Sequence, residues 1–168
     1  MEEDNFSKSV NRVPIFYMGL DCSSRAVHAV LLDFKERIIA KEKWASTWPD
    51  FLDRFPEMLT KFQDNLSKIK VTLKAAVESA IFIQNPKSTI EIASVVGAVN
   101  FICYTQSIEC TQVDNRHWKK IVLGKGNLNK KDIKAFAVEK WGDVFPEQDY
   151  ADAACIALWN KRRLVDGK

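Results

Sequence analysis

The first part of the chain alternates between short apolar segments and tight polar connections. Three such segments, residues 14–22, 26–34 and 37–44, are separated only by Ser-Ser-Arg and Lys-Glu. Short apolar or alternating runs joined by tight polar connections are typical of neighbouring antiparallel strands. The pattern therefore predicts a three-stranded antiparallel meander.

A helix and a fourth strand are predicted next. From Trp48 to about Ile69, apolar residues recur at three- and four-residue steps, which is the spacing of one helical face. Pro56 lies inside this segment, and a proline can interrupt a helix. A strand at residues 71–78 follows without a long loop. Because a helix between two strands can return the chain to the same end of a sheet, we expect residues 71–78 to run parallel to residues 14–22.

The segment after residue 84 has the signals of a helix start. Asn85-Pro86 opens it, and Ser88 with Glu91 has the spacing in which each side chain can satisfy a free backbone amide of the other. Further along, small residues form a surface that permits close approach, namely Ala93, Gly97 and Ala98. This surface fits packing on the sheet and also fits a subunit interface.

The last third predicts one more strand and three helices. The strand is expected at residues 109–114, and the helices at HWKKIVLG, at residues 129–141 and after Pro146. We therefore expect a flexible extension at residues 1–13 and one α/β domain at residues 14–164. The domain should contain a five-stranded mixed sheet flanked by helices.

Length and composition exclude several classes of protein. The chain has 168 residues, of which 46% are apolar and 28% charged, as in one ordinary globular domain. No run approaches the roughly 20 apolar residues of a membrane span, and the polar N-terminal segment fits no signal peptide. The four cysteines lie far apart without a CxxC pair, namely Cys22, Cys103, Cys110 and Cys155. This spacing favours free thiols, so we expect a cytoplasmic protein without membrane association.

Basic residues gather in one part of the chain. The net charge is only +3, yet residues 116–134 contain seven basic side chains and a single acid, Asp132. The basic side chains of this block are Arg116, Lys119, Lys120, Lys125, Lys130, Lys131 and Lys134. Such a block fits a solvated surface, and it also fits a surface that tracks phosphates.

Four carboxylates fall where a site is expected. Asp21 ends the first strand, Glu78 ends the fourth, and Asp149 lies one helical turn from Asp152. Each alone is explained by a turn or a helix cap. If the two strands are parallel neighbours, however, all four acids converge at the sheet edge where α/β folds place their sites. Their repulsion calls for hard divalent cations, and Mg²⁺ suits such oxygen ligands best. Two ions roughly 4 Å apart can activate water for attack on a phosphodiester.

Five segments of the chain are informative when taken together in chain order, namely GLDCSSR, AVES, VVGAVN, WKKIVLGKGNLNKKDI and DYADAACIAL. Together they resemble the RuvC family of Holliday junction resolvases over residues 15–160, and the central motif is the most specific. The resemblance implies a ribonuclease H-like fold, a homodimer and nicking of opposed strands at a four-way DNA junction. It also implies two Mg²⁺ ions per active site, for which Mn²⁺ is expected to substitute.

The family's functional residues can be carried onto matching positions. Its metal-binding acids fall on Asp21, Glu78, Asp149 and Asp152, and its basic residues near the scissile phosphate fall on Lys119 and Lys130. A lysine there would neutralise charge that develops on the phosphate during cleavage. The resemblance implies that the remaining basic residues of the block hold the DNA backbone by charge.

The sequence departs from bacterial members of the family at three places. Cys22-Ser23 replaces Pro-Gly, and His28, which we interpret as structural, replaces a glycine. The family's stacking phenylalanine is replaced by Ile81, with Phe82 one residue later. Phe82 is thus a candidate for DNA contact, with core packing as the alternative. These departures indicate a divergent bacterial or phage member, acting in the bacterial cytoplasm.

The sequence is also compatible with other functions. A nuclease of the same fold that acts on RNA or flaps is the nearest alternative, followed by a non-catalytic junction-binding protein. GLDCSS also resembles the phosphate loop of actin-like ATPases, but 168 residues leave no room for their second domain. Among the tryptophans, Trp118 is a candidate for stacking on DNA, whereas the others are better explained by packing.

Overall fold

The computed structural model describes residues 13–45, 50–66, 71–80 and 85–167. The expected extension at residues 1–13 therefore lies outside the described residues, except for Val13. In chain order the elements are β1 (Ile15–Cys22), β2 (Ala26–Leu32), β3 (Ile38–Ala45), α1 (Phe51–Leu66), β4 (Thr72–Glu78), α2 (Pro86–Thr105), β5 (Glu109–Val113), α3 (Asn115–Leu123), α4 (Lys130–Trp141) and α5 (Gln148–Asp166). Their order and type agree with the prediction from sequence.

The five strands form one mixed sheet in the order β3-β2-β1-β4-β5. β1, β2 and β3 are antiparallel neighbours, which confirms the predicted meander. β4 pairs with β1 in parallel, as expected from the intervening helix, and β5 pairs in parallel with β4. β1 is therefore the central strand, and its carboxyl end lies beside that of β4.

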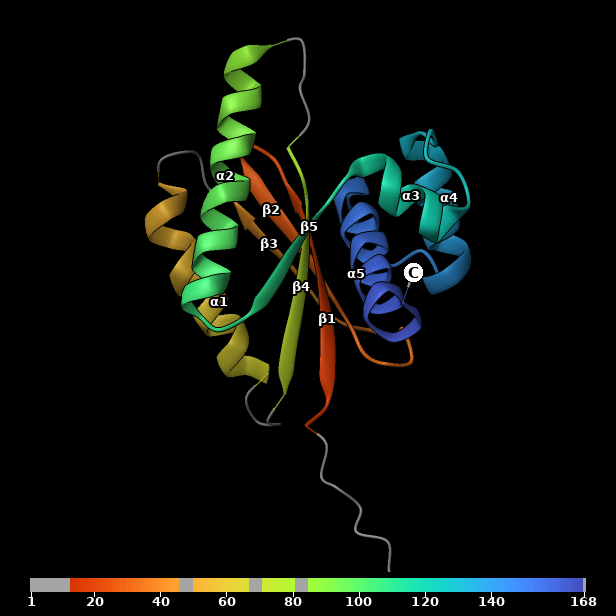
Figure 1. Cartoon of the computed structure of the whole chain (residues 1–168), viewed down its shortest axis with the longest axis horizontal. Helices are drawn as coiled ribbons and strands as arrows, with labels where there is room; N and C mark the ends of the chain where they lie inside the picture. The colour runs from red at the N-terminus through yellow and green to blue at the C-terminus, as the bar shows by residue number, and fades with distance from the viewer. Residues whose placement is uncertain (1–12, 46–49, 67–70, 81–84, 168) are drawn as a thin grey trace, which may run out of the picture.

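Helices cover both faces of the sheet (Figure 1). α1 and α2 lie on one face, where Trp44 of β3 meets the rings of Phe55 and Phe62 edge-on. α3, α4 and α5 lie on the other face, and α5 is buried along most of its length. The two apolar layers enclose β1, so its polar end residue is held within a rigid frame.

α5 crosses β1 in direct backbone contact at Gly19. A Cβ atom at this position would lie 2.0 Å from the carbonyl oxygen of Ala153 and 2.3 Å from the backbone nitrogen of Ala157. Only glycine leaves room for so close an approach. The contact brings the first turns of α5 to the carboxyl end of β1.

Two helices differ locally from the sequence expectation. α1 continues through Pro56, and its residues Phe51, Phe55 and Leu59 are buried. At α2 the expected capping pair of Ser88 and Glu91 is wrong. Asn85 caps the helix instead, because its side chain accepts hydrogen bonds from the backbone of Lys87 and Ser88.

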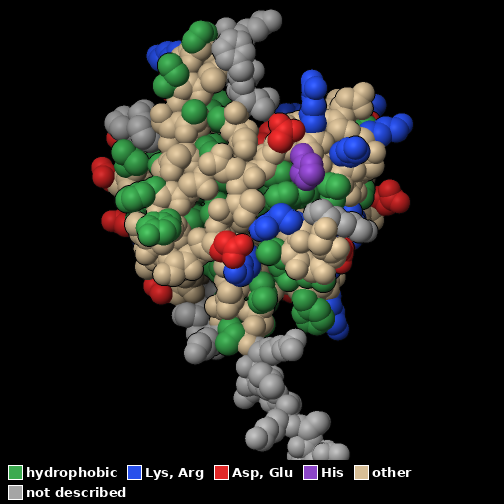
Figure 2. Space-filling model, viewed as in Figure 1, with side chains coloured by type: hydrophobic (Ala, Val, Ile, Leu, Met, Phe, Trp, Pro, Cys, Tyr) green, Lys and Arg blue, Asp and Glu red, His purple; other side chains and the backbone are tan. Residues whose placement is uncertain are grey.

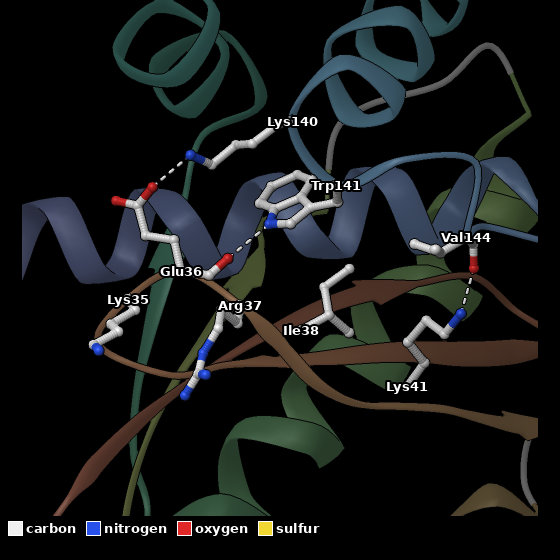
Figure 3. A pocket seen from close by; sticks show the side chains of 8 residues that line it. All are labelled: Lys35, Glu36, Arg37, Ile38, Lys41, Lys140, Trp141 and Val144. Atoms are coloured by element: carbon white, nitrogen blue, oxygen red, sulfur yellow. Dashed lines mark hydrogen bonds and ion pairs between the residues drawn. The ribbon is translucent and has the colours of Figure 1, made fainter.

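A cavity of about 560 Å³ lies against the β2–β3 turn, at the opposite end of the sheet from the end of β1 (Figure 3). Glu36 adopts a positive φ of 64° there, and its carboxylate pairs with Lys140 and Lys161. Its carbonyl oxygen accepts a hydrogen bond from Trp141. These contacts fasten the turn to α4 and α5.

Candidate active site

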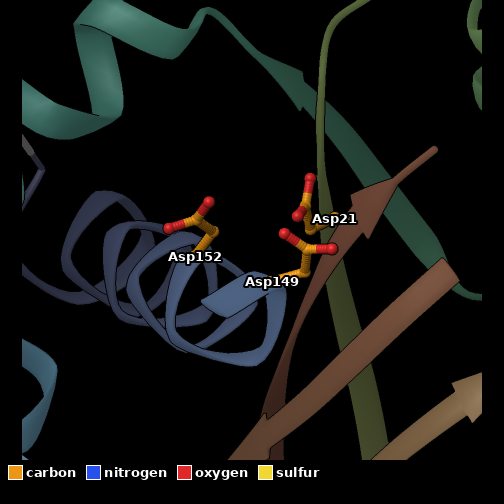
Figure 4. Close-up of side chains that lie close together, drawn as sticks. All are labelled: Asp21, Asp149 and Asp152. Atoms are coloured by element: carbon orange, nitrogen blue, oxygen red, sulfur yellow. The ribbon is translucent and has the colours of Figure 1, made fainter. Parts of the chain in front are cut away.

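Three aspartates meet at the carboxyl end of β1 (Figure 4). Asp21 comes from β1, whereas Asp149 and Asp152 come from the first turns of α5. One carboxylate oxygen from each of the three lies within 4.8 Å of the others. The structure thus brings together three of the four acids singled out in the sequence.

Glu78, the fourth acid, ends β4 next to this group. The parallel register places Leu20 opposite Val77, so Asp21 and Glu78 are the next residues of their strands at the same sheet edge. Glu78 is not part of the group of three, and both oxygens of its carboxylate accept hydrogen bonds from α3. Its Oε1 accepts a hydrogen bond from Asn115 at 2.7 Å, and its Oε2 accepts one from Trp118 Nε1 at 2.7 Å.

Asp21 and Asp152 are held in an environment that disfavours their negative charge. Burial, together with the charges of Asp152, Glu78 and Asp149, raises the pKa of Asp21 well above its usual range. Burial also raises the pKa of Asp152 to about 6, although a hydrogen bond from Gln148 and the charge of Lys130 oppose the rise. A cation bound among these carboxylates would favour their charged forms and so lower both pKa values.

The donor set fits a hard divalent cation. All three ligand atoms are carboxylate oxygens, two from half-buried side chains and one from a buried side chain. Oxygen-only ligation of this kind suits Mg²⁺, Mn²⁺ or Ca²⁺ and disfavours soft metals. Asp21, Asp149 and Asp152 could therefore hold a metal ion, with Glu78 close enough to influence their charge.

The two lysines proposed near the scissile phosphate differ in their surroundings. Lys130 begins α4, and its Nζ lies 3.2 Å from Oδ1 of Asp149. Lys119 lies on α3, where its Nζ is 5.5 Å from the centroid of the Trp118 ring. Within the described part of the chain, Lys119 makes no ion pair with the site acids. The structure thus brings Lys130 to the acidic group and places Lys119 over the ring of Trp118.

The rest of the basic block lies on the surface beside the acids. Lysine and arginine side chains gather over α3, α4 and the loop between them (Figure 2). The exposed members are Arg116, Lys120, Lys125, Lys131 and Lys134, together with Lys130. Phe82, the other candidate for DNA contact, and Ile81 lie outside the described residues.

The contacts that three residues make at the site were not foreseen from the sequence. Trp118 is fully buried, so the expectation that it stacks on DNA was wrong. Its real contact, Glu78, is shared with Asn115. His28 pairs with Asp21 in the β1–β2 register and lies 3.3 Å from Glu147 Oε2 and 3.9 Å from Asp149 Oδ2. The only sequence signal of these contacts was the expected position of His28 on the strand next to Asp21.

The chain is similar to proteins of known family and structure. The family model described as crossover junction endodeoxyribonuclease RuvC matches residues 25–159. The RuvC of Brachyspira hyodysenteriae is 26% identical over 114 residues, which cover 68% of this chain and 71% of that relative.

Two solved structures share the fold. The Thermus thermophilus RuvC in complex with Holliday junction substrate superposes with a TM-score of 0.74 at 17% identity, covering 90% of this chain and 96% of that one. The yeast mitochondrial Holliday junction resolvase gives a TM-score of 0.54 at 12% identity, covering 89% and 78%. Both have the ribonuclease H-like fold expected from the sequence. By the extent of the family match, this chain belongs to the crossover junction endodeoxyribonuclease RuvC family.

Proposed function

We propose that this protein is a metal-dependent endonuclease that nicks opposed strands of four-way DNA junctions. The observation that carries the proposal is the group of three aspartates at the end of β1. One carboxylate oxygen from each aspartate lies within 4.8 Å of those from the other two. An exposed basic surface lies directly beside it on α3 and α4. The family is named for junction cleavage, and a relative of the same fold was solved with a Holliday junction.

The proposed reaction is hydrolysis of a phosphodiester. Asp21, Asp149, Asp152 and Glu78 would hold two Mg²⁺ ions, with Mn²⁺ as a substitute. When bound, these ions supply an activated water and stabilise the leaving 3′ oxygen. Lys130, already beside Asp149, and Lys119 would offset negative charge that develops on the phosphate. The burial of Asp21 and Asp152 keeps the site partly shielded from bulk water, which strengthens these interactions.

The basic surface would hold the DNA backbone. Arg116, Lys120, Lys125, Lys131 and Lys134 are exposed and make no ion pair with an acid in the described part of the chain. Their charges remain available for phosphates, which they would bind without reading the base sequence. DNA binding and metal binding would thus be carried by adjacent but different residues.

The outer face of α2 supports a homodimer. Exposed small or apolar residues recur there at helical spacing, namely Ile90, Ala93, Gly97, Phe101 and Tyr104. Ile90 and Phe101 are each 66% exposed and Tyr104 is 80% exposed, whereas Ala98 packs against the core. α2 is long and apolar enough to cross a membrane. Length and composition are weak evidence for a membrane span, however, because the inner side of α2 packs in the core. Two copies of the stripe would bury each other, and opposed strands could then be cut by two active sites.

Replacing Phe101 by glutamate should convert the dimer to a monomer, because it places a charge in the middle of the apolar stripe. The control is Gln106→Glu, which introduces a carboxylate at the exposed residue that caps the same helix and lies outside the helical spacing of the stripe. Sedimentation equilibrium measures both, and Gln106→Glu should remain dimeric. A monomeric wild-type protein at micromolar concentration would count against the interface.

The test of the nuclease proposal is a panel of substrates with the same flanking sequence. A four-way junction, a flap, a linear duplex and an RNA–DNA hybrid are each incubated with Mg²⁺ or with EDTA. We expect nicks in opposed strands of the four-way junction, only with Mg²⁺. Faster cutting of the flap or hybrid would assign the enzyme to another substrate, and binding without cleavage would indicate a non-catalytic protein.

We also propose that the protein acts in the bacterial cytoplasm. All four cysteines are free thiols in the structure, as is usual in a reducing compartment. Residues 14–164 would act as one nuclease domain there.

A further inference from the structure

Both oxygens of Glu78 are held by side chains of α3. Asn115 Nδ2 donates to Oε1 and Trp118 Nε1 donates to Oε2, each at 2.7 Å. The two donors are three residues apart, so they lie on the same side of the first turns of α3. Hydrogen bonds to a charged carboxylate are stronger than those between neutral groups. Glu78 is therefore fixed in one orientation by two strong contacts from a single helix.

The backbone prevents α3 from moving freely relative to β4. Val113, the last residue of β5, pairs with Glu78, and its carbonyl oxygen accepts a hydrogen bond from the Ser79 amide. Asp114 then caps α3 by accepting from the backbone of Arg116 and His117. Only Asp114 thus separates α3 from the strand that pairs with the glutamate. A shift of the helix would be transmitted directly to the carboxylate.

The indole is the rigid part of this connection. Trp118 has no exposed surface, and burial leaves a large ring few alternative rotamers. The Nζ atom of Lys119 lies 5.5 Å from the centroid of the same ring. One side chain therefore lies between a candidate phosphate-binding lysine and a candidate metal-binding glutamate.

Glu78 keeps the capacity to bind a metal while these contacts persist. Each carboxylate oxygen can accept in two directions, and each uses one for α3. Carboxylate ligands that are themselves hydrogen-bonded in this way are usual around protein-bound metals, and removing such a partner typically weakens metal binding. Asn115 and Trp118 therefore have the position and chemistry of supports for a metal ligand.

We propose that Asn115 and Trp118 are positioning residues that hold Glu78 for metal binding and couple it to DNA docking on α3. This inference rests on the proposed function, because it takes α3 as a DNA-binding helix and Glu78 as a metal ligand. Binding of phosphates to α3 would fix the helix, and the fixed helix would hold the glutamate. By thermodynamic linkage, metal must then raise junction affinity by the same factor as the junction raises metal affinity.

The test replaces Trp118 by phenylalanine, which keeps an aromatic ring and removes the N–H donor. The matched control is Trp159→Phe, because Trp159 is also buried and its Nε1 has no hydrogen-bond partner in the part of the chain that the structure describes. Metal affinity is measured on DNA-free protein from the Mn²⁺ concentration that raises the melting temperature. We expect Trp118→Phe to weaken it by about 10- to 100-fold, the range found for loss of such a support. Trp159→Phe should leave it unchanged.

The coupling between metal and DNA is measured in a second experiment, which compares the junction affinity in Ca²⁺ with that in EDTA. A gel verifies that the substrate remains intact. Wild type and Trp159→Phe should bind the junction more tightly with Ca²⁺, whereas Trp118→Phe should lose this gain and keep its affinity in EDTA. Equal behaviour of the two phenylalanine variants would overturn the proposal and leave the Trp118 contact as packing. If Trp118→Phe does not fold, Asn115→Ala tests the same point, since Asn115 is only partly buried and its loss leaves no large void.

The outcomes separate this inference from the nuclease proposal. A wild-type protein that neither binds nor nicks the four-way junction would refute the proposed function. In that case the DNA-free metal measurement still decides whether Trp118 and Asn115 support Glu78. A wild-type protein that cuts the junction, with a Trp118→Phe variant of unchanged metal affinity and coupling, refutes only the positioning role.

Discussion

Replacing Asp21 by asparagine should reduce Mg²⁺-dependent nicking of the four-way junction by about 10³-fold or more. Asp21 is the one acid of the group of three that lies on the central strand, and its pKa responds to all three other acids. It therefore lies where their charges converge. Loss of a metal ligand removes several kcal/mol of transition-state stabilisation, and each 1.36 kcal/mol is tenfold in rate. Nicking rates at saturating enzyme measure the effect.

The same substitution should stabilise the metal-free protein. Because the pKa values of Asp21 and Asp152 are raised in the folded state, the folded protein binds more protons than the unfolded chain above the ordinary aspartate pKa. Stability should therefore fall as the pH rises from about 4 through about 6, the pKa of Asp152. The asparagine side chain carries no charge to be desolvated, so Asp21→Asn should melt at a higher temperature than wild type at pH 7.5 in EDTA.

Two comparisons make the Asp21→Asn result specific. Asp143→Asn changes the same functional group at an exposed site and should leave nicking and melting unchanged. Asp149→Asn should lose nicking but keep junction binding, because phosphate contacts would come mainly from α3 and α4. Full activity of Asp21→Asn would show that the metal site lies elsewhere.

The strands were predictable because their signal is local. Apolar runs between tight polar connections gave the three antiparallel strands, and the helix at α1 implied that β4 runs parallel to β1. Once those two strands are neighbours, Asp21 and Glu78 must end at the same edge. The Asp149–Asp152 spacing then needed only α5 to pack on β1. The placement of the acids thus followed from strand order and helical periodicity.

The orientation of Glu78 was not predictable in this way. Its two donors come from α3, 37 and 40 residues further along the chain. A pattern of apolar and polar positions indicates which side of an element is buried, but it does not indicate which buried side chain meets which acid. Trp118 shows the consequence, since its neighbour Lys119 suggested DNA contact while its burial directs the indole inward. The cap of α2 was missed for a similar reason, because Asn85 and Ser88 both have side chains suited to capping.

The backbone contact at Gly19 is one on which the site geometry depends. Gly19 carries no sequence signal beyond lying in an apolar strand, and its role follows only from the crossing of α5. The atoms it faces are backbone atoms of Ala153 and Ala157, which follow the site residues Asp149 and Asp152 on the same helix. Strand and helix are thus fixed to each other within two turns of the acids. Any change that widens this contact must move the acids.

Gly19→Ala should therefore be severely destabilising. An added methyl group would lie 2.0 Å from a carbonyl oxygen and 2.3 Å from a backbone nitrogen, and no rotamer change can relieve contacts with backbone atoms. Overpacking of a core costs about 1–3 kcal/mol where side chains can adjust, and more where they cannot. A loss of more than about 3 kcal/mol corresponds to a fall in melting temperature of roughly 6–12 °C for a domain of this size. Any folded protein should also nick about 100-fold more slowly, because a displacement of α5 by about 1 Å moves Asp149 and Asp152.

Two further variants show whether the cause is the backbone contact at Gly19. Gly97→Ala adds the same methyl group where no atom lies within 4 Å, so that protein should stay folded and gain about 0.5–1 kcal/mol in helix stability, whatever its effect on association. Gly19→Ala combined with Ala157→Gly should be no more stable than Gly19→Ala alone, because the atoms that clash belong to the backbone of Ala153 and Ala157. Circular dichroism during thermal unfolding distinguishes these cases. Rescue by Ala157→Gly would mean that side-chain volume sets the spacing of β1 and α5, and the position of the two aspartates would then tolerate repacking.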